Sequence, residues 1–260
     1  RNEPLLGFCF APHAPYTVSD KSLRQVAIYA GELELPVHMH IHETRDEINQ
    51  SVQDHGVRPL LRLERLGLLG PGLIAVHAIH LEPSEIDLLA RHGCHVAHCP
   101  SSNLKLASGL APIAALLTAN INVGLGTDGA ASNNRLDMFA EIRLAALLAK
   151  GTSGNATALP AWRALELATL GSARALGLDD TIGTLAAGKC ADITAVNLSA
   201  LELAPCYDPL SHLVYAAGRE HVSHVWINGE LMVDNGTLTT IDMREVQARA
   251  AFWHARIKPS

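Results

Sequence analysis

The 260-residue sequence predicts an α/β fold with a parallel sheet, followed by a smaller β module. Short apolar segments alternate with helical segments through residues 5–128, which is the order found in parallel α/β proteins. Polar side chains recur where the predicted strands end, and in a β/α barrel that end of the sheet carries the active site. After residue 179, alternating segments separated by glycine turns predict antiparallel strands.

The boundaries of these elements follow from apolar periodicity, capping residues and glycine or proline breaks. Strands are predicted at residues 5–12, 37–42, 73–77, 94–100 and 121–128, and in the β module at 183–185, 188–196 and 222–231. Helices are predicted at about 19–34, 58–66, 84–91, 112–119, 136–150, 160–176 and 243–255. Residues 101–103 read as a polar loop and residues 151–157 as a flexible connector.

The second predicted strand carries three histidines that alternate with apolar residues and lead into a carboxylate, Glu43. A period of two would put His38, His40 and His42 on one face of the strand. Imidazole is a common transition-metal ligand, and a neighbouring carboxylate can move protons for a metal-bound water. The alternative is a strand whose histidines bond only to backbone or solvent.

Two further side chains end predicted strands, His77 after the third and Asp128 after the fifth. Asp128 lies in Gly-Thr-Asp-Gly, where an ordinary turn aspartate is the simpler interpretation. At the end of a strand in this series, it also stands where a ligand or a base would lie. The same two interpretations are open for His77.

Composition excludes several classes of function. Hydrophobic residues make up 48% of the chain, enough for a sizeable core, and the formal net charge is −6 without a basic cluster, so nucleic acid and anionic membranes are not expected partners. The five cysteines include no Cys-x-x-Cys pair and predict reduced thiols in a cytoplasmic protein. No apolar run is long enough for a membrane span, and no Gly-x-Ser-x-Gly elbow or phosphate-binding glycine loop is present.

Five ordered motifs resemble the amidohydrolase superfamily. They occupy residues 12–16, 38–44, 77–81, 98–103 and 126–133. Within the superfamily they are most similar to the 5′-methylthioadenosine/S-adenosylhomocysteine deaminases and their chlorohydrolase relatives. The resemblance implies the last five strands of a (β/α)8 metal-dependent hydrolase barrel over residues 1–179, a small β-sandwich module over 180–240, and a C-terminal helix over 241–260.

The resemblance also implies roles for particular residues. The family's His-x-x-Glu pattern selects His40 as a metal ligand, with His38 as a neighbour, and Asp128 as the second ligand in this chain. Catalytic roles fall to Glu43, His77 and Asp128, and substrate binding to His13, Glu43, Asp128 and Ser132. Because no bridging lysine is present, one divalent ion is expected, either zinc or iron, with zinc preferred.

The expected reaction is therefore the deamination of 5′-modified adenosines, with methylthioadenosine and S-adenosylhomocysteine first among them. Two alternatives stay open: a related hydrolase acting on another heterocycle, such as guanine or a chlorotriazine, and an inactive remnant that only binds. The expected partner is a small nucleoside, and we expect a homo-oligomer located in the cytoplasm.

The family's Asp-x-His-x-His motif, which supplies two metal ligands, is absent before residue 12, and the sequence does not begin with methionine. We therefore expect roughly 150–200 further residues upstream, by comparison with a typical barrel of ~250 residues. On the same reasoning, residues 1–260 alone are not expected to be a stable, active unit, because an open barrel leaves unpaired strand edges.

Overall fold

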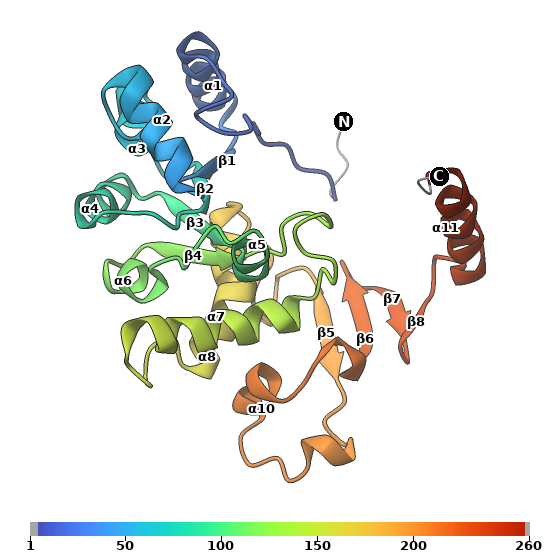
Figure 1. Cartoon of the computed structure of the whole chain (residues 1–260). Coiled ribbons are helices and arrows are strands. Elements are labelled where there is room, and N and C mark those ends of the chain that lie inside the picture. The colour runs from blue at the N-terminus through green and yellow to red at the C-terminus, as the bar shows by residue number, and fades with distance from the viewer. Residues whose placement is uncertain (1–4, 258–260) are drawn as a thin grey trace.

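The computed structural model describes residues 5–257. The first four residues of the predicted barrel portion and the last three of the predicted C-terminal helix lie outside the described residues. A four-stranded parallel sheet in the order β1-β2-β3-β4 forms its centre (Figure 1). These strands are β1 (Val37–Ile41), β2 (Leu73–His77), β3 (His95–His98) and β4 (Asn122–Leu125). The parallel α/β fold expected from the sequence is confirmed.

Helices precede, connect and follow the parallel strands, and most of them lie along one side of the sheet in Figure 1. They are α1 (Asp20–Leu33), α2 (Arg45–His55), α3 (Pro59–Arg65), α4 (Pro83–His92), α5 (Pro100–Lys105), α6 (Ile113–Thr118) and α7 (Met138–Ser153). Local signals explain their ends: the Ser19 hydroxyl accepts the Ser22 N–H at the start of α1, and Gly93 ends α4 with a φ of 66°. Among the described residues, no helix is long and apolar enough to cross a membrane.

The core lies between the sheet and these helices. Met39 and Leu73 on the strands are 1% exposed, and Leu63, Leu89 and Leu116 on the helices are fully buried. The opposite face of β1 to β4 borders an open cavity, which the side chains at the strand ends face.

A helical run from residue 161 to 175 packs against β4. It consists of α8 (Ala161–Glu166), a π-helical turn (Leu167–Gly171) and α9 (Ser172–Ala175). At Gly171 a Cβ atom would lie 2.5 Å from the carbonyl oxygen of Val123, so only glycine permits this approach. The predicted helix over 160–176 is confirmed, with the π-turn as an additional feature.

Four expectations about the elements up to residue 153 were wrong. Residues 5–12 are not a buried strand: they pair with the sheet only through Phe10 and Val37, and Phe8 is 73% exposed. Residues 101–103 lie inside α5 instead of a loop, because Pro100 opens a helical turn there. The helix α2 was not predicted from the sequence, and α7 extends to Ser153, into the expected connector.

The second sheet is antiparallel and has the order β5-β6-β7-β8. Its strands are β5 (Ile193–Val196), β6 (Val222–Ile227), β7 (Glu230–Asp234) and β8 (Thr237–Leu238). Residues 183–185, predicted as a strand, form a bend and turn region that pairs with no strand in the described part of the chain. Along the chain, the helix α10 (Pro209–Tyr215) comes after β5 and before β6, and α11 (Met243–Ile257) follows β8 as expected.

Candidate active site

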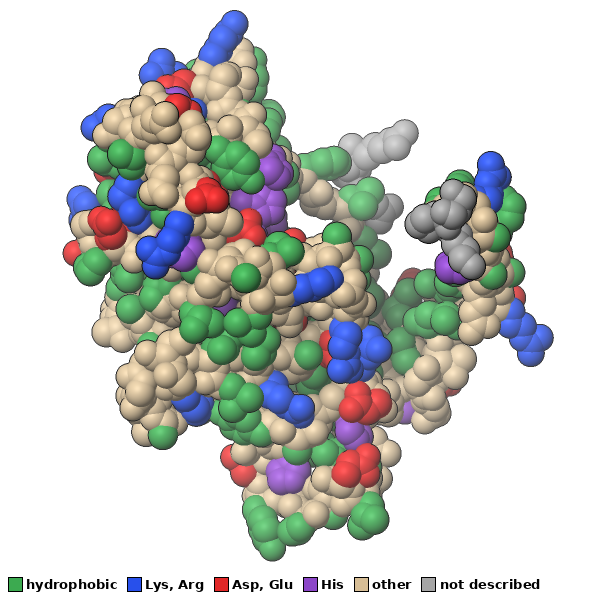
Figure 2. Space-filling model, viewed as in Figure 1, with side chains coloured by type: hydrophobic (Ala, Val, Ile, Leu, Met, Phe, Trp, Pro, Cys, Tyr) green, Lys and Arg blue, Asp and Glu red, His purple; other side chains and the backbone are tan. Residues whose placement is uncertain are grey.

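A cavity of about 460 Å³ lies against one face of the parallel sheet and is bordered by Ser172 and Ala175 of α9. It includes the C-terminal end of β1 and the residues that directly follow β3 and β4. Its polar lining includes His13, His38, His40, Cys99 and Asp128. Histidine side chains gather close to β1 in the space-filling view (Figure 2). The parallel strands thus bring most of the predicted site residues to one end of the sheet.

His40 is held in one tautomer by the chain that precedes it. Its Nδ1 donates a hydrogen bond to the carbonyl oxygen of His13 at 2.7 Å, and a carbonyl can only accept. In the neutral ring, Nε2 therefore carries a free lone pair, which is the arrangement a metal ligand needs. The His13 ring lies 5.1 Å from that of His40, and the His77 ring stacks on it at 5.4 Å.

His77 ends β2 in an unusual backbone conformation. Its φ is 72° and that of Ala78 is 47°, a left-handed pair that costs free energy and is typical of functional sites. The His77 side chain is 1% exposed, and its Nδ1 donates to Oδ1 of Asn103 at 2.7 Å. Its Nε2 consequently faces Oε2 of Glu43, 3.6 Å away.

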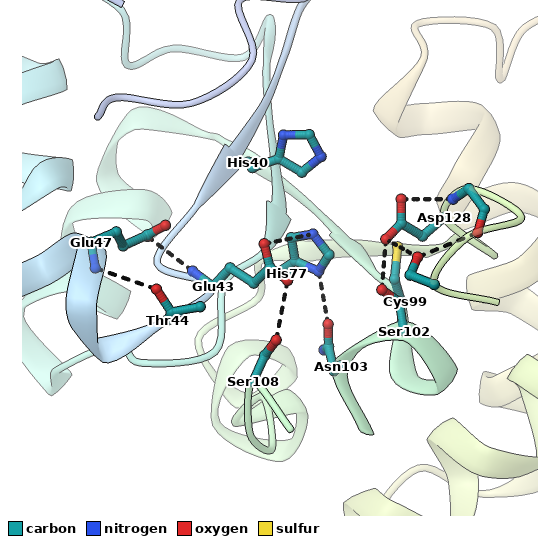
Figure 3. Close-up of polar contacts among 12 residues, drawn as sticks. His40, Glu43, Thr44, Glu47, His77, Cys99, Ser102, Asn103, Ser108 and Asp128 are labelled. Atoms are coloured by element: carbon teal, nitrogen blue, oxygen red, sulfur yellow. Dashed lines mark hydrogen bonds and ion pairs between the residues drawn. The ribbon is translucent and has the colours of Figure 1, made fainter. Parts of the chain in front are cut away.

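The Glu43 carboxylate lies between two partners (Figure 3). The hydroxyl of Ser108 donates to its Oε1 at 3.1 Å, while its Oε2 faces His77. The side chain keeps 18% of its surface exposed, so it is accessible to a small molecule. A carboxylate with this exposure, next to an imidazole, can exchange protons with a bound ligand.

Asp128 follows β4 in a left-handed conformation, with a φ of 60°. Its Oδ2 accepts the hydroxyls of Ser102 at 2.6 Å and Ser132 at 2.8 Å, and its Oδ1 accepts the N–H of Gly129 at 2.7 Å. Partial burial opposes ionisation, but these hydrogen bonds outweigh it and leave the pKa of Asp128 below its usual value. The carboxylate is therefore charged at neutral pH and oriented from three sides.

The expectation that three histidines share one face of β1 was wrong for His42. This residue has a φ of 56°, which ends the alternation and turns its side chain into the core. Its Nε2 accepts the N–H of Leu60, and its Nδ1 donates to the carbonyl of His80. Burial lowers the pKa of His42 to about 4, so the ring is neutral and structural. His38 is exposed and forms part of the cavity wall.

The residues of this chain supply only part of a metal site. Within residues 5–257, no group of three or more histidine, cysteine, aspartate or glutamate side chains is arranged to hold an ion. His40, with a free Nε2 lone pair, and Asp128, with a charged carboxylate, line the same cavity. This pair is one imidazole and one carboxylate, short of the three or four protein ligands that zinc usually has.

Four residues that contact the site residues were not identified from the sequence: Glu47, Ser102, Asn103 and Ser108. Glu47 had a readable signal, because Thr44 followed by a glutamate three residues later is the signature of a capped helix start. Asn103 lies in one of the five motifs, but its pairing with His77 needs the distance between β2 and α5. Ser108 carries no local signal.

Comparison with known proteins identifies similar sequences and structures over almost the whole chain. A family model described as the amidohydrolase family matches residues 3–232. A 5-methylthioadenosine/S-adenosylhomocysteine deaminase of Teredinibacter turnerae is 49% identical over 257 residues, which cover 99% of this chain and 58% of that protein. The chain thus spans less than two thirds of the length of this relative.

Two solved structures have closely similar folds. An adenosine deaminase from Xanthomonas campestris with bound zinc has a TM-score of 0.98 and 51% identity, covering 99% of this chain and 59% of that one. A variant of the atrazine chlorohydrolase from Arthrobacter aurescens, complexed with zinc and atraton, has a TM-score of 0.88 and 29% identity, covering 93% and 53%.

Proposed function

The chain belongs to the amidohydrolase family, and from this premise we propose that the full-length protein deaminates 5′-modified adenosines. Water replaces the amino group at C6 of the adenine ring, giving the inosine analogue and ammonia. Methylthioadenosine and S-adenosylhomocysteine are the first candidates, since the Teredinibacter turnerae relative is named for both. The proposal rests on one arrangement of side chains. Glu43 contacts His77 in the same site as Asp128, and three hydrogen-bond donors hold the Asp128 carboxylate.

Each of these residues has a proton to hold or move. Glu43, in its protonated form, gives a proton to the ring nitrogen beside C6 as water adds to that carbon. His77 orients the attacking water through Nε2, since its Nδ1 is occupied by Asn103. Asp128, charged before the reaction, takes one proton from this water and passes it to the departing amine. The second proton of the water returns to Glu43, which restores the starting state.

We propose that His40 and Asp128 are two ligands of one divalent ion, zinc in preference to iron. A zinc-type ion lowers the pKa of a coordinated water to about 7 and so makes hydroxide available at neutral pH. The Nε2 lone pair of His40 and the charge of Asp128 support this assignment, as does the zinc bound to the Xanthomonas campestris relative. The remaining ligands would come from outside residues 5–257.

His13 and Ser132 are proposed to bind the substrate. The His13 ring lines the cavity beside His40, and its Nδ1 is hydrogen-bonded with the Thr17 hydroxyl at 2.9 Å. The Ser132 hydroxyl lies against the Asp128 carboxylate, where it could also meet a bound ligand.

The domain division stays a proposal: part of a (β/α)8 barrel over residues 1–179, a small β-sandwich module over 180–240, and a helix over 241–260. The parallel order of β1 to β4 and the bridge at Phe10 support the barrel. The antiparallel sheet β5 to β8 supports the module. The homo-oligomeric state and the cytoplasmic location also stay predictions.

Ammonia release by the full-length protein from methylthioadenosine, guanine and a chlorotriazine tests the substrate class, with chloride release measured for the last. We expect turnover of methylthioadenosine at a kcat/KM well above that for guanine or the triazine. Preferred turnover of guanine or the triazine would favour the related-hydrolase alternative. No turnover of any of them by zinc-loaded protein would favour a binding role.

A further inference from the structure

Glu47 is a buried carboxylate, one helical turn after Glu43, to which the proposed chemistry assigns no role. It is 6% exposed and lies at the third position of α2. Its Oε1 accepts the backbone N–H of Glu43 at 2.9 Å, and the Thr44 hydroxyl accepts the backbone N–H of Glu47 at 3.3 Å. Figure 3 shows these contacts on the side of Glu43 that faces away from His77.

The backbone of Glu43 is held from both sides. On the N-terminal side, His42 has a φ of 56°, and its buried ring is bonded to the N–H of Leu60 and the carbonyl of His80. On the C-terminal side, Glu47 binds the N–H of residue 43. The left-handed turn at His42 is sparsely populated by residues other than glycine, so contacts of this kind are needed to maintain it.

Burial of its carboxylate makes Glu47 energetically unfavourable as a helix-capping residue. It raises the pKa of Glu47 to about 7, although the backbone amides of residues 42, 43 and 44 favour the charged form. An exposed carboxylate would serve the helix N-terminus without this cost, and Asp46 in the same turn is exposed. The buried position of Glu47 is therefore explained better by its contact with Glu43 than by helix capping.

We propose that Glu47 is a positioning residue that aims Glu43: its carboxylate holds the backbone of residue 43 so that the Glu43 carboxylate faces Nε2 of His77. The consequence for activity rests on the proposed function. Without this contact, the peptide of Glu43 can rotate, and the carboxylate moves away from Ser108 and His77. A misplacement of about 1 Å at a catalytic group can lower the rate ~10²-fold.

The test compares two substitutions of similar size in the zinc-loaded full-length protein. Glu47→Gln keeps an oxygen that can accept the Glu43 N–H, whereas Glu47→Met keeps the length of the side chain without an acceptor. We expect Glu47→Met to lower kcat about 10²-fold with little change in KM and zinc content. Glu47→Gln should recover most of the loss, and the control Asp46→Ala should behave like the wild type.

Three kinetic results would overturn the proposal: wild-type kcat in Glu47→Met, an equal loss in Glu47→Gln, or an equal loss in Asp46→Ala. The first would show that the contact is dispensable. The second would show that the acceptor oxygen is not what matters. The third would assign the effect to the charge of the first turn of α2.

Amide hydrogen exchange tests the same contact without reference to activity. Loss of this buried hydrogen bond should make exchange of the Glu43 N–H roughly 10-fold faster in Glu47→Met, and not in Asp46→Ala. Unchanged exchange in Glu47→Met would refute the positioning role. A wild-type protein that deaminates no adenosine would refute the proposed function instead, and the exchange result would still decide the role of Glu47.

Discussion

Replacing Ser102 with alanine removes the shorter of the two hydroxyl contacts to Asp128. The Ser102 Oγ lies 2.6 Å from Oδ2 of Asp128, and the Ser132 Oγ lies 2.8 Å from the same oxygen. A hydrogen bond to a charged group contributes about 1.5–3 kcal/mol, which corresponds to about 10- to 150-fold in an equilibrium constant. Loss of a group that orients a metal ligand typically costs about 10- to 100-fold in affinity. We therefore expect Ser102→Ala to weaken zinc binding about 10- to 100-fold.

Competition with a chelator of known affinity measures this change in the full-length protein. Ser51→Ala is the matched control, because Ser51 is 5% exposed and its hydroxyl donates only to the carbonyl of Val57. The double variant Ser102→Ala/Ser132→Ala should bind zinc more weakly than either single variant, since both hydroxyls contact one oxygen. Wild-type affinity in Ser102→Ala and in the double variant would refute the reasoning.

Three further outcomes are expected in the full-length protein. His40→Ala and Asp128→Ala should each sharply lower metal content by elemental analysis, and wild-type stoichiometry in both would remove them as ligands. Gly171→Ala should lower the free energy of unfolding in chemical denaturation, because its Cβ would lie 2.5 Å from a carbonyl oxygen, whereas Gly151→Ala in open space on α7 should stabilise by about 0.5–1 kcal/mol. Equal effects of the two would contradict the close approach. Burial raises the pKa of Glu47 from 4.5 to about 7, so its contribution to stability is fully present below pH 4.5 and is lost as the pH rises through 7. Glu47→Gln should therefore gain stability relative to the wild type over this range, on the order of 3 kcal/mol, and a pH-independent difference would contradict this.

The parallel half of the fold could be predicted because its signals are local. The strand Leu73–His77 is apolar up to its terminal histidine and flanked by turns, and α1 has a serine cap and a regular apolar stripe. The helix α2 was missed because its sequence is mostly polar, with Ile48 as its one buried aliphatic residue among those described. Residues 5–12 were wrongly predicted to form a buried strand, because their apolar composition does not show whether a neighbouring strand is present to pair with them.

The predicted site residues came from strand ends and family motifs, and the structure shows their contacts. The sequence could not reveal that His42 turns into the core, because a left-handed residue ends the period of two on which the prediction depended. The partners of His77 and Glu43 depend on tertiary distances: Asn103 is 26 residues from His77 and Ser108 is 65 residues from Glu43. Contacts across such separations depend on how α5 and the loop after it lie against the ends of β1 and β2.

Zinc content and kcat of Glu43→Gln, determined on the same preparation of the full-length protein with methylthioadenosine as substrate, test the central assignment most directly. The substitution preserves the shape of the side chain and an oxygen for the Ser108 hydroxyl, but removes the group that carries the proton. We predict wild-type zinc content and a kcat lower by ~10²–10⁴-fold, the usual contribution of general acid–base catalysis. A variant that keeps its zinc and turns over at nearly the wild-type rate would contradict the account.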